Sequence, residues 1–165
     1  MLPLQLVVTL GHVMASALWV GAMVFFLVVL GPSVNPLEPT IAIQALNRGR
    51  IGFEILSWIA IALLLLTGVF NLLLRVSVPT VAVGRFYIVI LSIKLLVFGA
   101  MLAQHCLQAF KYAPAIANLT SRLPESANRW PEAMLDQWRR WFLLLKINAA
   151  LGPIAILLGL NLIQS

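Results

Sequence analysis

Four long apolar runs constrain this chain more than any other feature of its sequence. A helix needs about 20 residues, each rising about 1.5 Å, to cross the hydrocarbon core of a bilayer. The four runs reach that length, at residues 4–30, 51–74, 86–110 and 141–163. They lack the apolar–polar alternation of a barrel wall, so strands are not expected. The sequence therefore predicts an all-α polytopic membrane protein, a four-helix transmembrane bundle forming one domain over residues 1–165.

The composition excludes several classes of protein. Of the 165 residues, 62% are hydrophobic and 10% are charged, whereas about 25% are charged in soluble domains. Too few polar side chains are present to cover a soluble enzyme, and the chain is too apolar to be disordered. One cysteine, Cys106, excludes an intramolecular disulfide and a multi-cysteine metal cage. The net charge is +6, and the basic residues that produce it are scattered among membrane-length apolar runs. We therefore expect them to contact anionic lipid headgroups, and we expect no nucleic-acid partner.

The distribution of basic residues predicts an orientation. Four spans put both termini on one side of the membrane, here called the terminal side. Apart from the α-amino group, Arg75 and Arg85 are the basic residues of that side, and eight lie on the opposite side: Arg48, Arg50, Lys111, Arg122, Arg129, Arg139, Arg140 and Lys146. The positive-inside rule places the opposite side in the cytoplasm, so the termini are predicted to be periplasmic or lumenal, in a bacterial inner membrane. The N-terminal run lacks a basic leader and a cleavage site, so we expect it to be retained.

One further element is expected in the third loop, at residues 130–140. Aromatic and methionine side chains fall on one helical stripe there, and Pro131 stands at a plausible first position. The simplest interpretation is an interfacial amphipathic helix with its tryptophans at headgroup depth. A helix that docks a partner or covers a cofactor is the alternative.

Ionisable side chains inside the spans require an explanation, because inserting each of them into hydrocarbon costs at least about 2.5–3.5 kcal/mol of free energy. His12 and Lys94 each lie eight residues into their spans from the terminal side, or about 12 Å deep. Ser16, Thr67 and Asn71 fall close to the same level. A bundle can bring these five side chains around one polar pocket that binds a cofactor. The alternatives are packing roles for the histidine and the neutral residues and, for Lys94, snorkelling to the membrane surface.

A second polar layer is expected near the opposite side. It contains Glu54, His105 and Asn148, with Arg50 and Lys146 close by. Glu54 can pair with Arg50 one turn away, or accept a hydrogen bond from His105. Asn148 is expected to bridge helices.

The same residues suggest metal or haem chemistry. Met101 and His105 lie one turn apart, next to Cys106, and soft ligands of this kind suit copper. His12 is a further candidate ligand. His105 lies about 16 Å deeper than His12, so the two cannot clamp one haem b within a chain, whereas haem on a single histidine or between two protomers remains possible.

Four segments, taken in order, resemble the copper-resistance protein D (CopD) family. "GHVMASALWVGAMVFFLVVLGP" (residues 11–32) is similar to the opening helix of that family. Arg50 and Phe53, followed by "LLTGVFNLL" (residues 65–73), continue the likeness, as do the lysine within "ILSIKLLV" (residues 90–97) and the asparagine that leads the fourth span. The resemblance covers most of the chain except residues 111–140.

The resemblance implies a membrane protein of copper uptake or homeostasis. Typical members have about twice as many spans, so this chain is similar to one half, which suggests a homo-oligomer or a larger membrane complex. Where relatives continue the third helix into a histidine-containing stretch, only His105 matches. A weaker likeness links His12 and Lys94 to the HemJ-type protoporphyrinogen oxidases, although the arginine- and histidine-rich segment of that family is missing.

Three hypotheses follow. The first is a CopD-type metal-handling protein with His12 and His105 as ligands, assisted by Met101 or Cys106. The second is a haem- or porphyrin-binding protein or oxidase, in which His12 ligates the iron and Lys94 neutralises a propionate or carries a proton. The third is a non-catalytic subunit of a larger membrane assembly.

Overall fold

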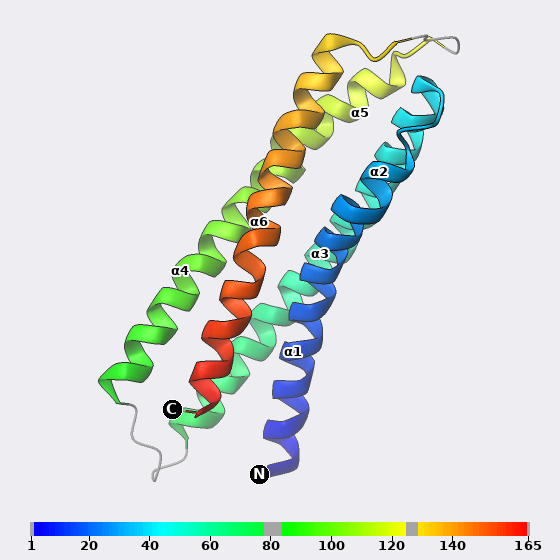
Figure 1. Cartoon of the computed structure of the whole chain (residues 1–165). Coiled ribbons are helices and arrows are strands. Elements are labelled where there is room, and N and C mark those ends of the chain that lie inside the picture. The colour runs from blue at the N-terminus through cyan, green and yellow to red at the C-terminus, as the bar shows by residue number, and fades with distance from the viewer. Residues whose placement is uncertain (1, 78–83, 125–128, 165) are drawn as a thin grey trace.

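The computed structural model describes residues 2–77, 84–124 and 129–164, and within them it is all-helical. Four long helical units run antiparallel and place the two termini at the same end (Figure 1). The elements are α1 (Leu2–Phe25), η1 (Phe26–Leu30), α2 (Gly31–Ser33), α3 (Pro39–Val76), α4 (Arg85–Leu107), η2 (Gln108–Tyr112), α5 (Ala113–Ser121) and α6 (Glu132–Gln164). Four of the resulting helical stretches are long and apolar enough to cross a membrane, which confirms the predicted all-α fold with four apolar helices.

The helices form because an apolar run in hydrocarbon must satisfy its backbone N–H and C=O groups internally. The outward faces agree with this environment, since large apolar side chains are exposed along all four units, Leu6, Leu66, Leu96 and Leu157 among them. Such a surface would be unstable in water and is expected of an integral membrane protein.

The bundle consists of two antiparallel pairs, α1 with α3 and α4 with α6, joined where α1 packs on α6. Gly152 allows this close approach, because a Cβ there would lie 2.6 Å from Cγ2 of Val20. The next residue, Pro153, lies inside α6, and the helix continues through it.

The core between the pairs is aromatic. Trp19, Phe26 and Trp141 are among its largest buried side chains. Two π-helical turns converge there: Phe26 opens η1, and its ring centroid lies 4.9 Å from that of Trp141. Gln108 opens η2, and its Nε2 donates to the Trp141 carbonyl over 3.0 Å. Turns of this kind often mark functional regions of a helix.

The helices extend beyond the predicted spans. α3 begins at Pro39 rather than near residue 51, and the third unit continues through η2 and α5 to Ser121. Hydropathy identifies only the part of a helix that suits hydrocarbon, so polar helical turns beyond it escape detection.

The separate interfacial helix is not seen, and this expectation is corrected. Residues 132–140 are the first turns of α6, continuous with the fourth span. Met134 and Trp138 on the predicted stripe are buried in the core. The stripe has the periodicity of an interfacial helix, but it packs against protein because α6 lies along the bundle from its first turns.

Candidate functional site

On the terminal side, His12 of α1 and Thr67 of α3 form the central contact of the first polar layer. Nδ1 of His12 lies 2.8 Å from Oγ1 of Thr67. Oγ1 of Thr67 also lies 2.5 Å from the carbonyl oxygen of Leu63. A hydroxyl carries one hydrogen, and two oxygens this close require it between them. Thr67 therefore donates to Leu63 and accepts from the ring, which assigns the Nδ1–H tautomer to His12 and leaves the Nε2 lone pair available.

Replacing Thr67 with valine tests this assignment. The substitution keeps the shape of the side chain but removes the hydroxyl that contacts Nδ1 of His12, so we expect a loss of about 0.6–2 kcal/mol of stability. Unfolding in a denaturing detergent measures it, and ¹⁵N chemical shifts report the ring tautomer. The matched control is Thr120→Val, because that hydroxyl bonds only the Ile116 carbonyl of its own helix. Equal effects of the two substitutions would contradict the assignment.

Ser16 and Asn71, the other neutral residues predicted for this layer, each make one hydrogen bond. The Ser16 hydroxyl donates to the His12 carbonyl of its own helix over 2.8 Å. Asn71 accepts a hydrogen bond from the Thr9 hydroxyl over 3.1 Å, which links α1 and α3 one turn nearer the terminal side. Both contacts support helix packing around His12 and Thr67.

Lys94 joins the layer from α4. The end of its side chain lies against α6, where a Cβ at Gly159 would lie 2.9 Å from Nζ and 3.6 Å from Cε. Gly159 stands three residues before Leu162, whose carbonyl accepts a 2.8 Å hydrogen bond from Nη1 of Arg75. The side chain of Lys94 thus extends toward the terminal side.

This first layer has no acidic residue. In the sequence, the five acids all lie toward the opposite side or in the third loop: Glu38, Glu54, Glu125, Glu132 and Asp136. Glu125 falls outside the described residues. A layer that contains an ammonium group and no carboxylate repels a metal cation and attracts an oxyanion.

The second layer is centred on His105 of α4, which is 0% exposed. Three aromatic rings surround its imidazole: the centroids of Trp58, Phe53 and Trp19 lie 5.0, 6.1 and 6.2 Å away. Within the described part of the chain, neither Nδ1 nor Nε2 of His105 has a hydrogen-bond partner. A buried polar group in that state costs about 1–3 kcal/mol, so it needs an explanation.

Other buried polar atoms without partners lie around His105. Met101, one turn earlier on the same face of α4, is 1% exposed. Its carbonyl accepts a 3.2 Å hydrogen bond from Nδ2 of Asn148, whose Oδ1 has no partner among the described residues. The buried hydroxyl of Ser57, which precedes Trp58 in the sequence, and the indole N–H of Trp19 also have no hydrogen-bond partner among the described residues. Asn148 thus bridges helices, and the cluster presents one imidazole, one thioether and neutral oxygens.

The predicted metal ligands do not all come together. His105 contacts Trp19, which is seven residues, or about 10 Å of helix rise, after His12 on α1. The two histidines are therefore at different depths, although the contact places His105 nearer the level of His12 than the roughly 16 Å expected from the sequence. Cys106 is half-buried and lies about 100° around α4 from His105. Among the described residues, no three His, Cys, Asp or Glu side chains are grouped to hold a metal. The arrangement brings Met101 to His105 and leaves His12 and Cys106 outside that cluster.

Near the opposite side, Glu54 pairs with Arg50. Oε1 of Glu54 lies 2.6 Å from Nη1 of Arg50, and the two side chains are 19% and 4% exposed. Asn47 adds two contacts, since its Oδ1 accepts from Nε and Nη2 of Arg50 at 3.2 and 2.8 Å. Of the two partners considered for Glu54, the structure has Arg50.

Sequence reasoning missed Ser57, Gln108 and Asn47. Met101, His105 and Gln108 stand at i, i+4 and i+7, so helical spacing would have placed Gln108 on the buried stripe of α4. Ser57 was detectable as a polar residue within an apolar run. The role of Asn47 depends on the rotamer of Arg50, which no sequence pattern reveals.

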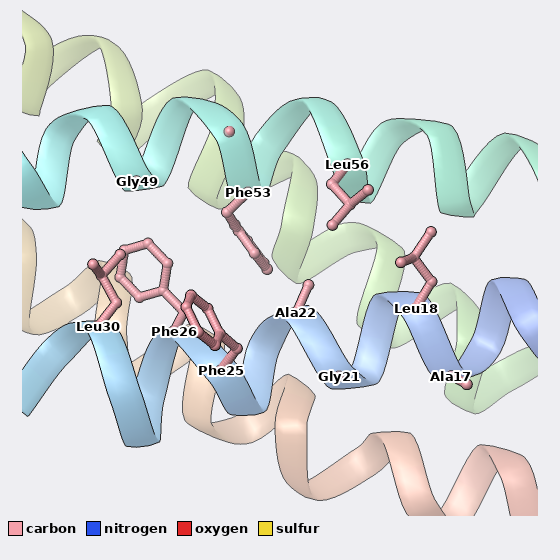
Figure 2. Close-up of a pocket in the computed structure, with 11 residues that line it drawn as sticks. Ala17, Leu18, Gly21, Ala22, Phe25, Phe26, Leu30, Gly49, Phe53 and Leu56 are labelled. Carbon is pink, nitrogen blue, oxygen red and sulfur yellow. The ribbon is translucent and has the colours of Figure 1, made fainter.

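An apolar groove of about 510 Å³ lies between α1 and α3. Figure 2 shows Leu18 and Ala22 of α1 and Phe26 of η1 on one side of it, with Phe53 and Leu56 of α3 opposite. One of its lining rings, Phe53, also contacts His105. The groove carries no polar ligand of its own.

Comparison with known proteins identifies one relative. Copper resistance protein D of Pseudomonas syringae pv. tomato is 34% identical over 113 residues, which make up 67% of this chain and 36% of the relative. No protein-family model matches the chain, and no solved structure gives a significant match. The chain thus matches 36% of the length of this relative. This distant similarity supports placing the chain, an integral membrane protein, in the copper resistance protein D (CopD) family.

Proposed function

We propose that this protein binds and handles copper ions within the membrane, with Met101 and His105 as ligands. One observation carries the proposal: the imidazole of His105 is fully buried and, among the described residues, both of its nitrogens lack partners, one turn from a buried thioether. A ligand-binding role explains why the polar group is kept at this position. Copper is the cargo in this proposal.

The donor set favours monovalent copper. An imidazole and a thioether are soft, neutral ligands, and the carboxylate of Glu54, one residue after Phe53, is paired with Arg50. Neutral ligands suit a singly charged ion in an apolar environment, since a higher charge would cost more to desolvate. Oδ1 of Asn148, whose Nδ2 donates to the Met101 carbonyl, is a neutral oxygen beside the cluster.

The relative supports the same cargo through its name, copper resistance protein D. Because the match takes in 36% of that protein, movement of copper across the membrane can depend on parts that this chain does not match. We therefore propose copper binding by this chain, and transport only within an oligomer or a larger membrane complex.

Replacing Met101 with leucine is the direct test. We expect the affinity for Cu(I) to fall roughly 10–100-fold, because the thioether is lost while the volume is kept. Competition against a chromogenic Cu(I) chelator measures the affinity of the detergent-purified protein. The control is Met134→Leu, an equally buried methionine in the first turn of α6. Equal affinities of the two variants would argue against this site.

A haem- or porphyrin-binding protein is the second candidate, and the first polar layer favours it. The available Nε2 of His12 suits an axial ligand, and the ammonium of Lys94 suits a carboxylate. A visible absorption spectrum separates the two candidates. A Soret band that disappears in His12→Ala, with no copper bound, would favour haem; bound copper without that band favours the first proposal.

A further inference from the structure

A second cavity, of about 670 Å³, lies toward the opposite side of the bundle, and neither Met101 nor His105 is among its lining residues. Its walls come from the segment after η1, from α3 and from the first half of α6. Apolar side chains line much of it, Leu46 and Phe142 among them. Two basic side chains, Arg139 and Lys146, line the same cavity, and no acidic residue is among its described lining residues.

The cavity also presents neutral donors. Trp138 lines it, is 3% exposed, and has an indole N–H without a partner among the described residues. The exposed amide of Asn35 stands at its rim. Two cations and two neutral donors beside an apolar wall match a molecule with an anionic, oxygen-rich head and an apolar body.

The position of the cavity along α6 identifies the occupant. Lys146 lies 18 residues before Gln164, the last residue of α6 (164 − 146), which is about 27 Å along the axis. The hydrocarbon core is about 30 Å thick, so with the end of α6 at the terminal surface, Lys146 reaches the other boundary. Arg139, two turns further on, then lies in the headgroup layer. Basic pockets between helices at this depth suit anionic lipid headgroups.

We propose that this cavity is a specific binding site for one anionic phospholipid. Arg139 and Lys146 hold the charged headgroup, the indole N–H of Trp138 donates to one of its oxygens, and the acyl chains lie against Leu46 and Phe142. The site is independent of the copper proposal, because it shares no residue with the Met101–His105 cluster.

Native mass spectrometry of the detergent-purified full chain, titrated with phosphatidylglycerol or phosphatidylcholine, tests the proposal. We expect preferential binding of one phosphatidylglycerol. Arg139→Gln and Lys146→Gln should each weaken it roughly fivefold, and the double variant roughly 25-fold. Arg140→Gln is the matched control: Arg140 is exposed one residue further along α6, does not line the cavity, and should change the affinity less than twofold.

A second variant tests the cavity itself. Asn35→Trp fills the rim without removing a charge, so it should also reduce binding of phosphatidylglycerol. Equal affinity for the two lipids, or an Arg140→Gln effect as large as that of Arg139→Gln, would overturn the proposal. Displacement of the lipid by millimolar inorganic phosphate would overturn it as well, since the site would then take a soluble oxyanion.

Discussion

Replacing His105 with leucine is expected to abolish copper binding while leaving the bundle at least as stable as the native protein. Even an outer-shell partner of a metal ligand contributes roughly 10–100-fold to affinity, so loss of the imidazole should weaken Cu(I) binding at least about a hundredfold. Stability should stay level or rise by up to about 2 kcal/mol, because the substitution removes a buried polar group whose nitrogens have no partner in the described structure. Chelator competition and detergent unfolding measure the two effects.

The opposite changes in affinity and stability make this test decisive. A histidine kept for structural reasons would destabilise the bundle when replaced, and an unfolded His105→Leu protein would therefore refute the binding role. His12→Leu is the control, because His12 precedes Trp19, the α1 contact of His105, by about 10 Å of helix rise, and it should retain Cu(I) affinity. Loss of copper binding in His12→Leu alone would move the site to the first polar layer.

Replacing Arg50 with methionine is expected to be the most destabilising single change among those considered. It leaves the carboxylate of Glu54, 19% exposed, without its cation, and removes both donors to Oδ1 of Asn47. Breaking a buried ion pair from one side costs about 3–5 kcal/mol. Thermal unfolding of the purified protein in detergent should show a correspondingly large decrease in Tm.

Two further variants isolate the cause. Arg48→Met removes a charge from an exposed position on the same helix and should have little effect. Adding Glu54→Leu to Arg50→Met should restore part of the stability, because the carboxylate left without its cation is then removed as well. If Arg48→Met and Arg50→Met are equally mild, the pair does not stabilise the fold.

The first polar layer shows what counting residues along each span can predict. Equal depth in two spans places His12 and Lys94 at one level. In the structure the His12 ring lies beside Thr67 of α3, and Nζ of Lys94 lies at Gly159 of α6. The direction of the Lys94 stem, toward Gly159 and the terminal side, depends on space that only the packing of α4 on α6 provides. The segment at residues 130–140 shows the limit: amphipathic periodicity predicted a separate helix, but tertiary contact buried its stripe.

The sequence by itself determined that the chain is a bundle of apolar helices, because hydrocarbon leaves an apolar backbone no other way to satisfy its hydrogen bonds. It also placed the ionisable residues at their depths, since the rise per residue is constant. Tertiary structure alone decided which of them meet: a helix can turn any face inward at little local cost, and packing between helices selects one. That selection left the nitrogens of His105 without partners beside Met101, paired Arg50 with Glu54, and opened the basic cavity at Arg139 and Lys146.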